Sequence, residues 1–99
     1  MAIVEVTIVP LGTKSTSLSK YVADCHKVLQ SEKKIKYQLT PMGTIIEGDL
    51  DVILQAIRKM HEVPFKKGAF RVSTTIRIDD RRDKVSTMKD KVDSVINKF

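Results

Sequence analysis

The residues best placed to do chemistry lie between Pro41 and Gly48, where the chain reads Pro-Met-Gly-Thr-Ile-Ile-Glu-Gly. Pro41 fixes its own φ angle, and Gly43 and Gly48 permit backbone angles that a side chain would forbid. A hydroxyl (Thr44) and a carboxylate (Glu47) are therefore expected on a short strand and not on a flexible loop. A few fixed polar groups beside apolar ones are what a small-molecule site requires. The alternative interpretation is a hairpin with ordinary turn residues.

The spacing of the two polar residues sets a geometric condition on such a site. Thr44 and Glu47 are three positions apart, so they point to opposite faces of an unbroken strand. They can share a pocket only if the strand ends at Glu47, if a bulge intervenes, or if the site spans two subunits.

The elements that must position this stretch follow from hydrophobic periodicity. Alternation of period two predicts strands over 2–9, 36–39, 44–47 and 70–78. Helical spacing predicts helices over 18–29, behind an N-cap at Ser17, and over 50–60, behind an N-cap at Asp49. Pro64 is expected to mark the end of the second helix. A last helix is predicted from Val85 to Phe99.

This order predicts one α+β domain over residues 1–99 with the ferredoxin-like βαββαβ arrangement. Right-handed crossovers place both long helices on one face of a four-stranded antiparallel sheet, and the C-terminal helix is an addition.

The other face of the predicted sheet has a mixed character. It carries Glu5, Thr7, Val9, Arg71, Ser73, Thr75 and Arg77. Apolar residues among these polar groups (Ile3 and Val9) suit a face that another subunit covers. We therefore expect a homo-oligomer. Glu5 or Asp79 is expected to pair with Arg71 or Arg77 across such a face.

Composition narrows the function classes. The chain has 99 residues, 41% hydrophobic and 30% charged, with a single cysteine and a formal net charge of +6. No apolar run is long enough for a membrane span and no secretory signal is visible, so a cytoplasmic protein without a membrane partner is expected. The basic residues are scattered and often alternate with acids, which is more typical of a solvated surface than of a nucleic-acid track.

Motifs for catalysis are missing from the sequence. The segment Gly12-Thr13-Lys14-Ser15-Thr16 lacks the glycine spacing of a phosphate-binding P-loop. Cys25 lies on the apolar stripe of the first helix and is expected to be a buried thiol. His26 lies beside that stripe without a triad or metal partner, so a surface position is expected. With no metal-spaced cluster and no carboxylate pair, we expect no enzyme and no metal site.

Four blocks together resemble a known family. They are Val9–Gly12, Ser17–Val22, Pro41–Gly48 and the run from Arg71 through Ile78 to Lys84. In this order they closely resemble the small thiamine-binding-protein family, and the likeness covers essentially the whole chain. The resemblance implies a ferredoxin-like domain, association through sheets into dimers and commonly tetramers, and binding of thiamine or its hydroxymethylpyrimidine moiety.

The chemistry of such a ligand suggests a role and a site. The role would be that of a non-catalytic carrier, buffer or sensor with no cofactor. The ligand-binding residues would be Ser17, Met42, Gly43, Thr44 and Glu47, with Arg71 and Ser73 on the neighbouring strand. Glu47 would accept from the ligand's amine, Thr44 or Ser17 would meet a ring nitrogen or hydroxyl, and Met42 would form an apolar wall.

Two other functions stay open at this point. One is a structural or regulatory assembly without a small ligand. The less favoured one is an RNA-binding module, which would need exposed aromatic residues on the central strands of the sheet. The chain has only five aromatic residues in all, three Phe and two Tyr.

Overall fold

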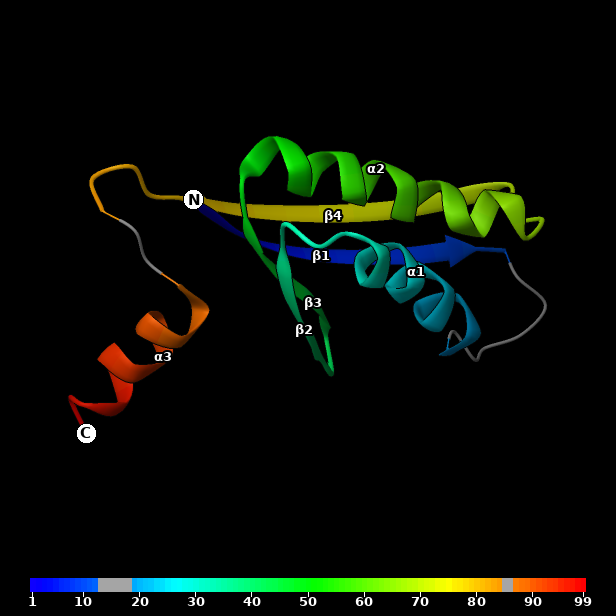
Figure 1. Ribbon diagram of the computed structural model, residues 1–99. Coiled ribbons are helices and arrows are strands. Elements are labelled where there is room, and N and C mark those ends of the chain that lie inside the picture. Colours follow the sequence, from blue (N-terminus) through cyan, green and yellow to red (C-terminus); the bar gives the residue numbers. More distant parts are fainter. Residues whose placement is uncertain (13–18, 85–86) are drawn as a thin grey trace.

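The computed structural model describes residues 1–12, 19–84 and 87–99. Its elements, in chain order, are β1 (Ala2–Leu11), α1 (Ser19–Ser31), β2 (Lys36–Thr40), β3 (Gly43–Gly48), α2 (Leu50–Lys66), β4 (Arg71–Asp80) and α3 (Met88–Ile96). The strands form one antiparallel sheet in the order β2-β3-β1-β4 (Figure 1). The predicted ferredoxin-like α+β fold with an added C-terminal helix is confirmed.

The core lies between the sheet and the two long helices. Val4 and Val6 of β1 and Ile46 of β3 are at most 2% exposed, because alternate residues of the central strands face α1 and α2. The helices contribute buried residues such as Leu29 and Ile53. Burial of these apolar side chains is the main driving force that holds the helices against the sheet.

The opposite side of the sheet, which we call the open face, is covered by neither α1 nor α2. It carries Ile3, Glu5, Thr7 and Val9 from β1, Lys36 and Gln38 from β2, Ile45 and Glu47 from β3, and Arg71, Ser73, Thr75, Arg77 and Asp79 from β4. Arg77 Nη1 lies 3.9 Å from Glu5 Oε1, which confirms the expected pairing of an acid with an arginine on this face. Both side chains are exposed, so the pair contributes little to stability.

Helix starts agree with the sequence where the structure describes them. Asp49 caps α2, because its Oδ2 accepts a hydrogen bond from the backbone N–H of Val52 at 3.3 Å. The predicted cap of α1, Ser17, and the predicted start of the last helix, Val85, lie outside the described residues. In the described part of the chain the last helix begins at Met88.

The prediction that Pro64 marks the end of the second helix is wrong. The helix continues to Lys66, with Pro64 buried in its last turns. Proline has no backbone N–H, so the carbonyl of Met60, four residues earlier, loses its helical donor. The thiol of Cys25, on α1, donates to that carbonyl at 3.5 Å. The proline is therefore tolerated because a side chain from the neighbouring helix replaces the missing donor.

Strand ends also differ from the prediction. The first strand does not stop at Val9 but continues through Pro10 to Leu11. Beyond Val6 this strand pairs with β4 and no longer with β3, so one of its edges has no neighbouring strand in the described sheet. A residue without a backbone donor is tolerated at such an edge. Phe70, expected to begin the last strand, lies before it and is 98% exposed.

Candidate functional site

A groove opens on the helix-covered side of the sheet, at the end where β1 and β3 part. It lies between α1 and the β2–β3 hairpin, which are neighbours in Figure 1, and has a volume of about 860 Å³. Residues from β1, α1, β2, β3 and the hairpin turn line it, together with Met60 of α2. This volume lies within the range of about 300–1,000 Å³ that is usual for small-molecule sites.

A hydrogen-bonded pair of side chains marks the floor of the groove. Thr44 follows the glycine that opens β3 and faces the helices, opposite Val6 of β1. Its Oγ1 lies 3.1 Å from Nε2 of His26 on α1, and Thr44 is only 6% exposed. The ring of His26 also packs edge-on against Tyr37 of β2, with 5.5 Å between ring centroids. The histidine is therefore not the partnerless surface residue that the sequence predicted.

The turn of the hairpin lies close against β1, and the close approach is possible because residue 43 is a glycine. A Cβ on Gly43 would lie 2.8 Å from Oγ1 of Thr7 and 2.9 Å from the carbonyl oxygen of Val6. The Thr7 hydroxyl donates to the carbonyl of Met42 at 3.1 Å, and Thr40 donates to the carbonyl of Gly43 at 2.9 Å. These contacts hold the hairpin turn as a fixed wall of the groove.

The rim of the groove is apolar and exposed. Met42 is 81% exposed, Leu39 is 57% exposed and Val22 on α1 is 37% exposed, and all three line the groove. Exposed apolar side chains that converge on a concave surface are typical of ligand sites. The thioether of Met42 is well suited to contact an aromatic ring.

Ionisable groups are few among the described lining residues. Burial lowers the pKa of His26, so its imidazole is neutral at pH 7. Burial, followed by the nearby Asp24 carboxylate, raises the pKa of Cys25 to about 11, so its thiol is protonated and serves as a donor. Lys27 pairs with Asp24 at 3.4 Å. The described lining includes no carboxylate.

The structure brings together three of the seven predicted site residues. Met42, Gly43 and Thr44 all line the groove, whereas Ser17 lies outside the described residues. Glu47 lies on the open face and not in the groove, because β3 runs unbroken from Gly43 to Gly48. Its side chain is buried there.

Glu47 already has a partner there, since its Oε2 accepts a hydrogen bond from the backbone N–H of Met88 at 2.8 Å. Arg71 and Ser73 also point to the open face, opposite Leu11 and Val9 of β1. None of these three residues lines the groove.

Sequence reasoning missed the contribution of α1. No partner of His26 lies near it in the sequence, and therefore no role in the site was predicted for it. Its partner, Thr44, comes eighteen positions later in the chain. The place of His26 beside the apolar stripe of α1, next to the buried Cys25, was the available signal. Thr40 also lines the groove and went unpredicted.

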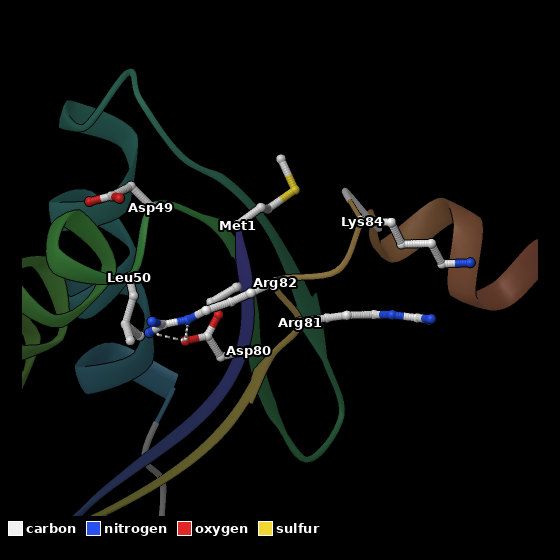
Figure 2. A pocket seen from close by; sticks show the side chains of 8 residues that line it. Met1, Asp49, Leu50, Asp80, Arg81, Arg82 and Lys84 are labelled. Carbon is white, nitrogen blue, oxygen red and sulfur yellow. Dashed lines mark hydrogen bonds and ion pairs between the residues drawn. The ribbon is translucent and has the colours of Figure 1, made fainter.

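A second, smaller cavity lies at the far end of the sheet. Its volume is about 380 Å³, and its lining includes Asp80, Arg81, Arg82 and Lys84 (Figure 2). Figure 2 shows that Arg82 runs toward Leu50 while Arg81 and Lys84 extend the opposite way. Each arginine pairs with a carboxylate, Arg82 with Asp80 at 2.8 Å and Arg81 with an aspartate two positions later at 2.6 Å. These cations do not converge, so the larger groove is the better candidate.

The described residues contain neither a candidate metal site nor a membrane-spanning helix. Residues 1–12, 19–84 and 87–99 contain no group of three or more His, Cys, Asp or Glu residues that could hold a metal ion. None of the helices in these ranges is long and apolar enough to cross a membrane.

Comparison with known proteins finds relatives over nearly the whole chain. The UPF0045 protein YqgV of Bacillus subtilis is 57% identical over 98 residues, which covers 96% of this chain and 94% of the relative. A UPF0045 protein of Methanothermobacter thermautotrophicus is 44% identical over 100 residues, with all of both chains covered.

Solved structures agree with the fold. A hypothetical protein from Methanocaldococcus jannaschii superposes with a TM-score of 0.85 at 37% identity, over 95% of this chain and 94% of that one. A Thermotoga maritima protein, whose name assigns it provisionally to thiamine biosynthesis or salvage, gives a TM-score of 0.77 over 95% of this chain and 97% of that one. Its identity of 20% supports the fold alone. Residues 4–96 match the family described as thiamine-binding protein, and the chain therefore belongs to that family.

Proposed function

We propose that the groove between α1 and the β2–β3 hairpin binds thiamine or its hydroxymethylpyrimidine moiety, and that the protein is a carrier, buffer or sensor without catalytic activity. The observation that carries this proposal is the Thr44–His26 pair on the floor of an otherwise largely apolar groove of about 860 Å³. Membership of a thiamine-binding family supports the same class of ligand.

The chemistry of the pair suits an aminopyrimidine. Such a ring offers an exocyclic amine as donor and ring nitrogens as acceptors, and it has an apolar face. A hydroxyl and a neutral imidazole can each donate or accept, so Thr44 and His26 together can satisfy a ring nitrogen or an amine. Met42 at the rim packs against the face of the ring.

The amine of the ligand needs an acceptor, and Glu47 was predicted for that role. On the open face Glu47 can serve only a site shared between two copies. Within one copy, the acceptors we propose are the hydroxyl of Thr40 and the backbone carbonyls of β1 between Thr7 and Val9. That stretch lines the groove and pairs with no strand on its β3 side in the described sheet.

We also propose that the protein is a homo-oligomer, a dimer or a tetramer, that forms through the open face. The half-buried Ile3 and Val9 of β1 and Ile45 of β3 lie among polar side chains on the two central strands of that face. Such a surface is suited to a subunit contact.

Titration calorimetry with hydroxymethylpyrimidine, thiamine and the thiamine phosphates tests the ligand proposal. We expect at least one of them to bind with a dissociation constant well below about 1 mM, which corresponds to roughly −4 kcal/mol. If none binds in this range, the proposal is wrong. Chromatography of the ligand after prolonged incubation tests the second part, because any turnover would contradict a purely binding role.

A further inference from the structure

Three sulfur atoms lie among the described lining residues of the groove, and they differ in exposure. Met42, at the hairpin turn, is 81% exposed, whereas Met60 is 2% exposed and Cys25 is 5% exposed. Cys25 is also unreactive, because burial and the nearby Asp24 carboxylate raise its pKa to about 11, and thiols react with oxidants as thiolates. A dissolved oxidant therefore reaches the thioether of Met42 before either of the other two sulfur atoms.

The backbone of Met42 is held on both sides of the peptide unit. Its carbonyl accepts a hydrogen bond from the Thr7 hydroxyl at 3.1 Å, and its N–H donates to Oγ1 of Thr40 at 3.4 Å. The next residue, Gly43, approaches β1 so closely that a Cβ there would lie 2.8 Å from Oγ1 of Thr7. These contacts fix the turn between β2 and β3 (Figure 1). The thioether is therefore kept at the rim, where both water and a ligand in the groove can contact it.

Oxidation at this position changes the chemical character of the rim. Leu39 and Val22, the other two exposed rim residues described above, are hydrocarbons that peroxides leave intact, whereas a thioether is converted to a sulfoxide. The sulfoxide is polar, so Met42 no longer offers a soft apolar surface to the face of an aromatic ligand. Modification of one exposed atom can therefore lower the affinity of the groove without disturbing the core.

We propose that Met42 is a modification site at which peroxides act on this protein, and that the sulfoxide form binds an aromatic ligand more weakly than the unmodified form. This inference rests on the proposed function and adds a means of regulation to the same groove. The contact that is lost, between a sulfur atom and an aromatic ring, corresponds to about a two- to tenfold change in the dissociation constant.

The reaction is the transfer of one oxygen atom. A lone pair of the Met42 sulfur attacks one oxygen of hydrogen peroxide, the O–O bond breaks as the S–O bond forms, and the second oxygen leaves with both protons as water. The sulfur loses two electrons and the peroxide gains them. A methionine sulfoxide reductase reverses the step with two thiols, which supply two electrons and two protons and end as a disulfide, and the oxygen leaves as water. The modification is therefore reversible.

The first measurement is the rate of sulfoxide formation at each methionine. The full chain is exposed to dilute hydrogen peroxide, and its peptides are mapped by mass spectrometry. We expect Met42 to be oxidised at least about tenfold faster than Met60, because access of the oxidant controls the rate. Saturating hydroxymethylpyrimidine or thiamine should slow the oxidation of Met42 and leave that of Met88, which does not line the groove, unchanged.

Calorimetry with hydroxymethylpyrimidine and thiamine, before and after peroxide treatment, gives the consequence for binding. The dissociation constant should rise about two- to tenfold in the wild type and in the control variant Met88→Leu, and methionine sulfoxide reductase with dithiothreitol should reverse the rise. Met42→Leu, whatever its initial affinity, should bind equally well before and after treatment. The melting temperature of the oxidised wild type should be unchanged, since Met42 is 81% exposed.

The outcomes separate this inference from the proposed function. If none of hydroxymethylpyrimidine, thiamine and the thiamine phosphates binds the untreated wild type, the proposed function fails and this inference fails with it. If a ligand binds but Met42 resists peroxide, or its sulfoxide form binds as tightly as the untreated protein, only the inference on Met42 is wrong. If treatment lowers the affinity of Met42→Leu as much as that of the wild type, another residue is responsible and the inference is again wrong.

Discussion

Replacing Thr44 by valine removes the hydroxyl on the floor of the groove and keeps nearly the same shape. Thr44 is 6% exposed, and Nε2 of His26 lies 3.1 Å from its hydroxyl. The loss of one neutral hydrogen bond costs a fold about 0.5–1.5 kcal/mol. A domain of this size loses roughly 4–8 °C in melting temperature for each kcal/mol, so a moderate shift is expected.

The same substitution should weaken the ligand. If the hydroxyl of Thr44 meets a ring nitrogen, the lost bond is again worth about 0.5–1.5 kcal/mol, or roughly a two- to tenfold increase in the dissociation constant. Thr44→Ser keeps the hydroxyl and should retain most of the affinity. Thr75→Val makes the same chemical change on the open face, at a residue that does not line the groove, and should leave affinity unchanged.

The assay is calorimetry with hydroxymethylpyrimidine, paired with thermal unfolding of each variant. The reasoning is refuted if Thr44→Val binds as tightly as the wild type, or if Thr44→Ser and Thr75→Val lose as much affinity as Thr44→Val. A loss of stability without a loss of affinity would show that the hydroxyl serves only the contact with His26.

Three more predictions concern neighbouring parts of the fold. Glu47→Gln removes an anionic acceptor from the Met88 N–H, so hydrogen exchange should speed up in the first turn of α3. Ligand affinity should not change, because Glu47 does not line the groove; a loss of affinity would indicate a site shared between two copies. Cys25→Val leaves the carbonyl of Met60 without a donor and should lower the free energy of unfolding by about 1 kcal/mol in urea titrations. Adding Pro64→Ala restores a backbone donor and should recover most of that loss, whereas additive effects of the two substitutions would show that Cys25 and Pro64 are not coupled. Burial holds the pKa of His26 below its unfolded value of 6.5, so the unfolded chain takes up more protons and the free energy of unfolding should fall as pH drops below about 6.5. If a His26→Gln variant shows the same decline, the decline comes from other groups.

Much of the fold could be predicted because its signals are local. Alternation along β1 and β4 identified the strands, and the order of the elements left few topologies to consider. The three-residue spacing of Thr44 and Glu47 already implied opposite faces, and the unbroken strand over 43–48 places them there.

The parts that could not be predicted depend on contacts between distant segments. Pro64 is a strong local stop signal, and only a thiol from another helix, thirty-nine positions earlier in the sequence, explains why the helix continues. The partner of His26 depends on where α1 crosses β3, which hydrophobic periodicity does not determine. The exposure of α3 could not be predicted either, because its apolar residues have the same spacing as those of a helix that packs on the core of its own chain.

Chemical-shift mapping of the amides with hydroxymethylpyrimidine tests the central claim most directly, because it reports where the ligand binds. We expect saturable shifts in the hairpin turn and at the start of β3, from Met42 to Thr44, and along α1 around His26. Shifts confined to the cavity lined by Arg81, Arg82 and Lys84, or no saturable shifts at millimolar ligand, would contradict the claim that this groove is the binding site.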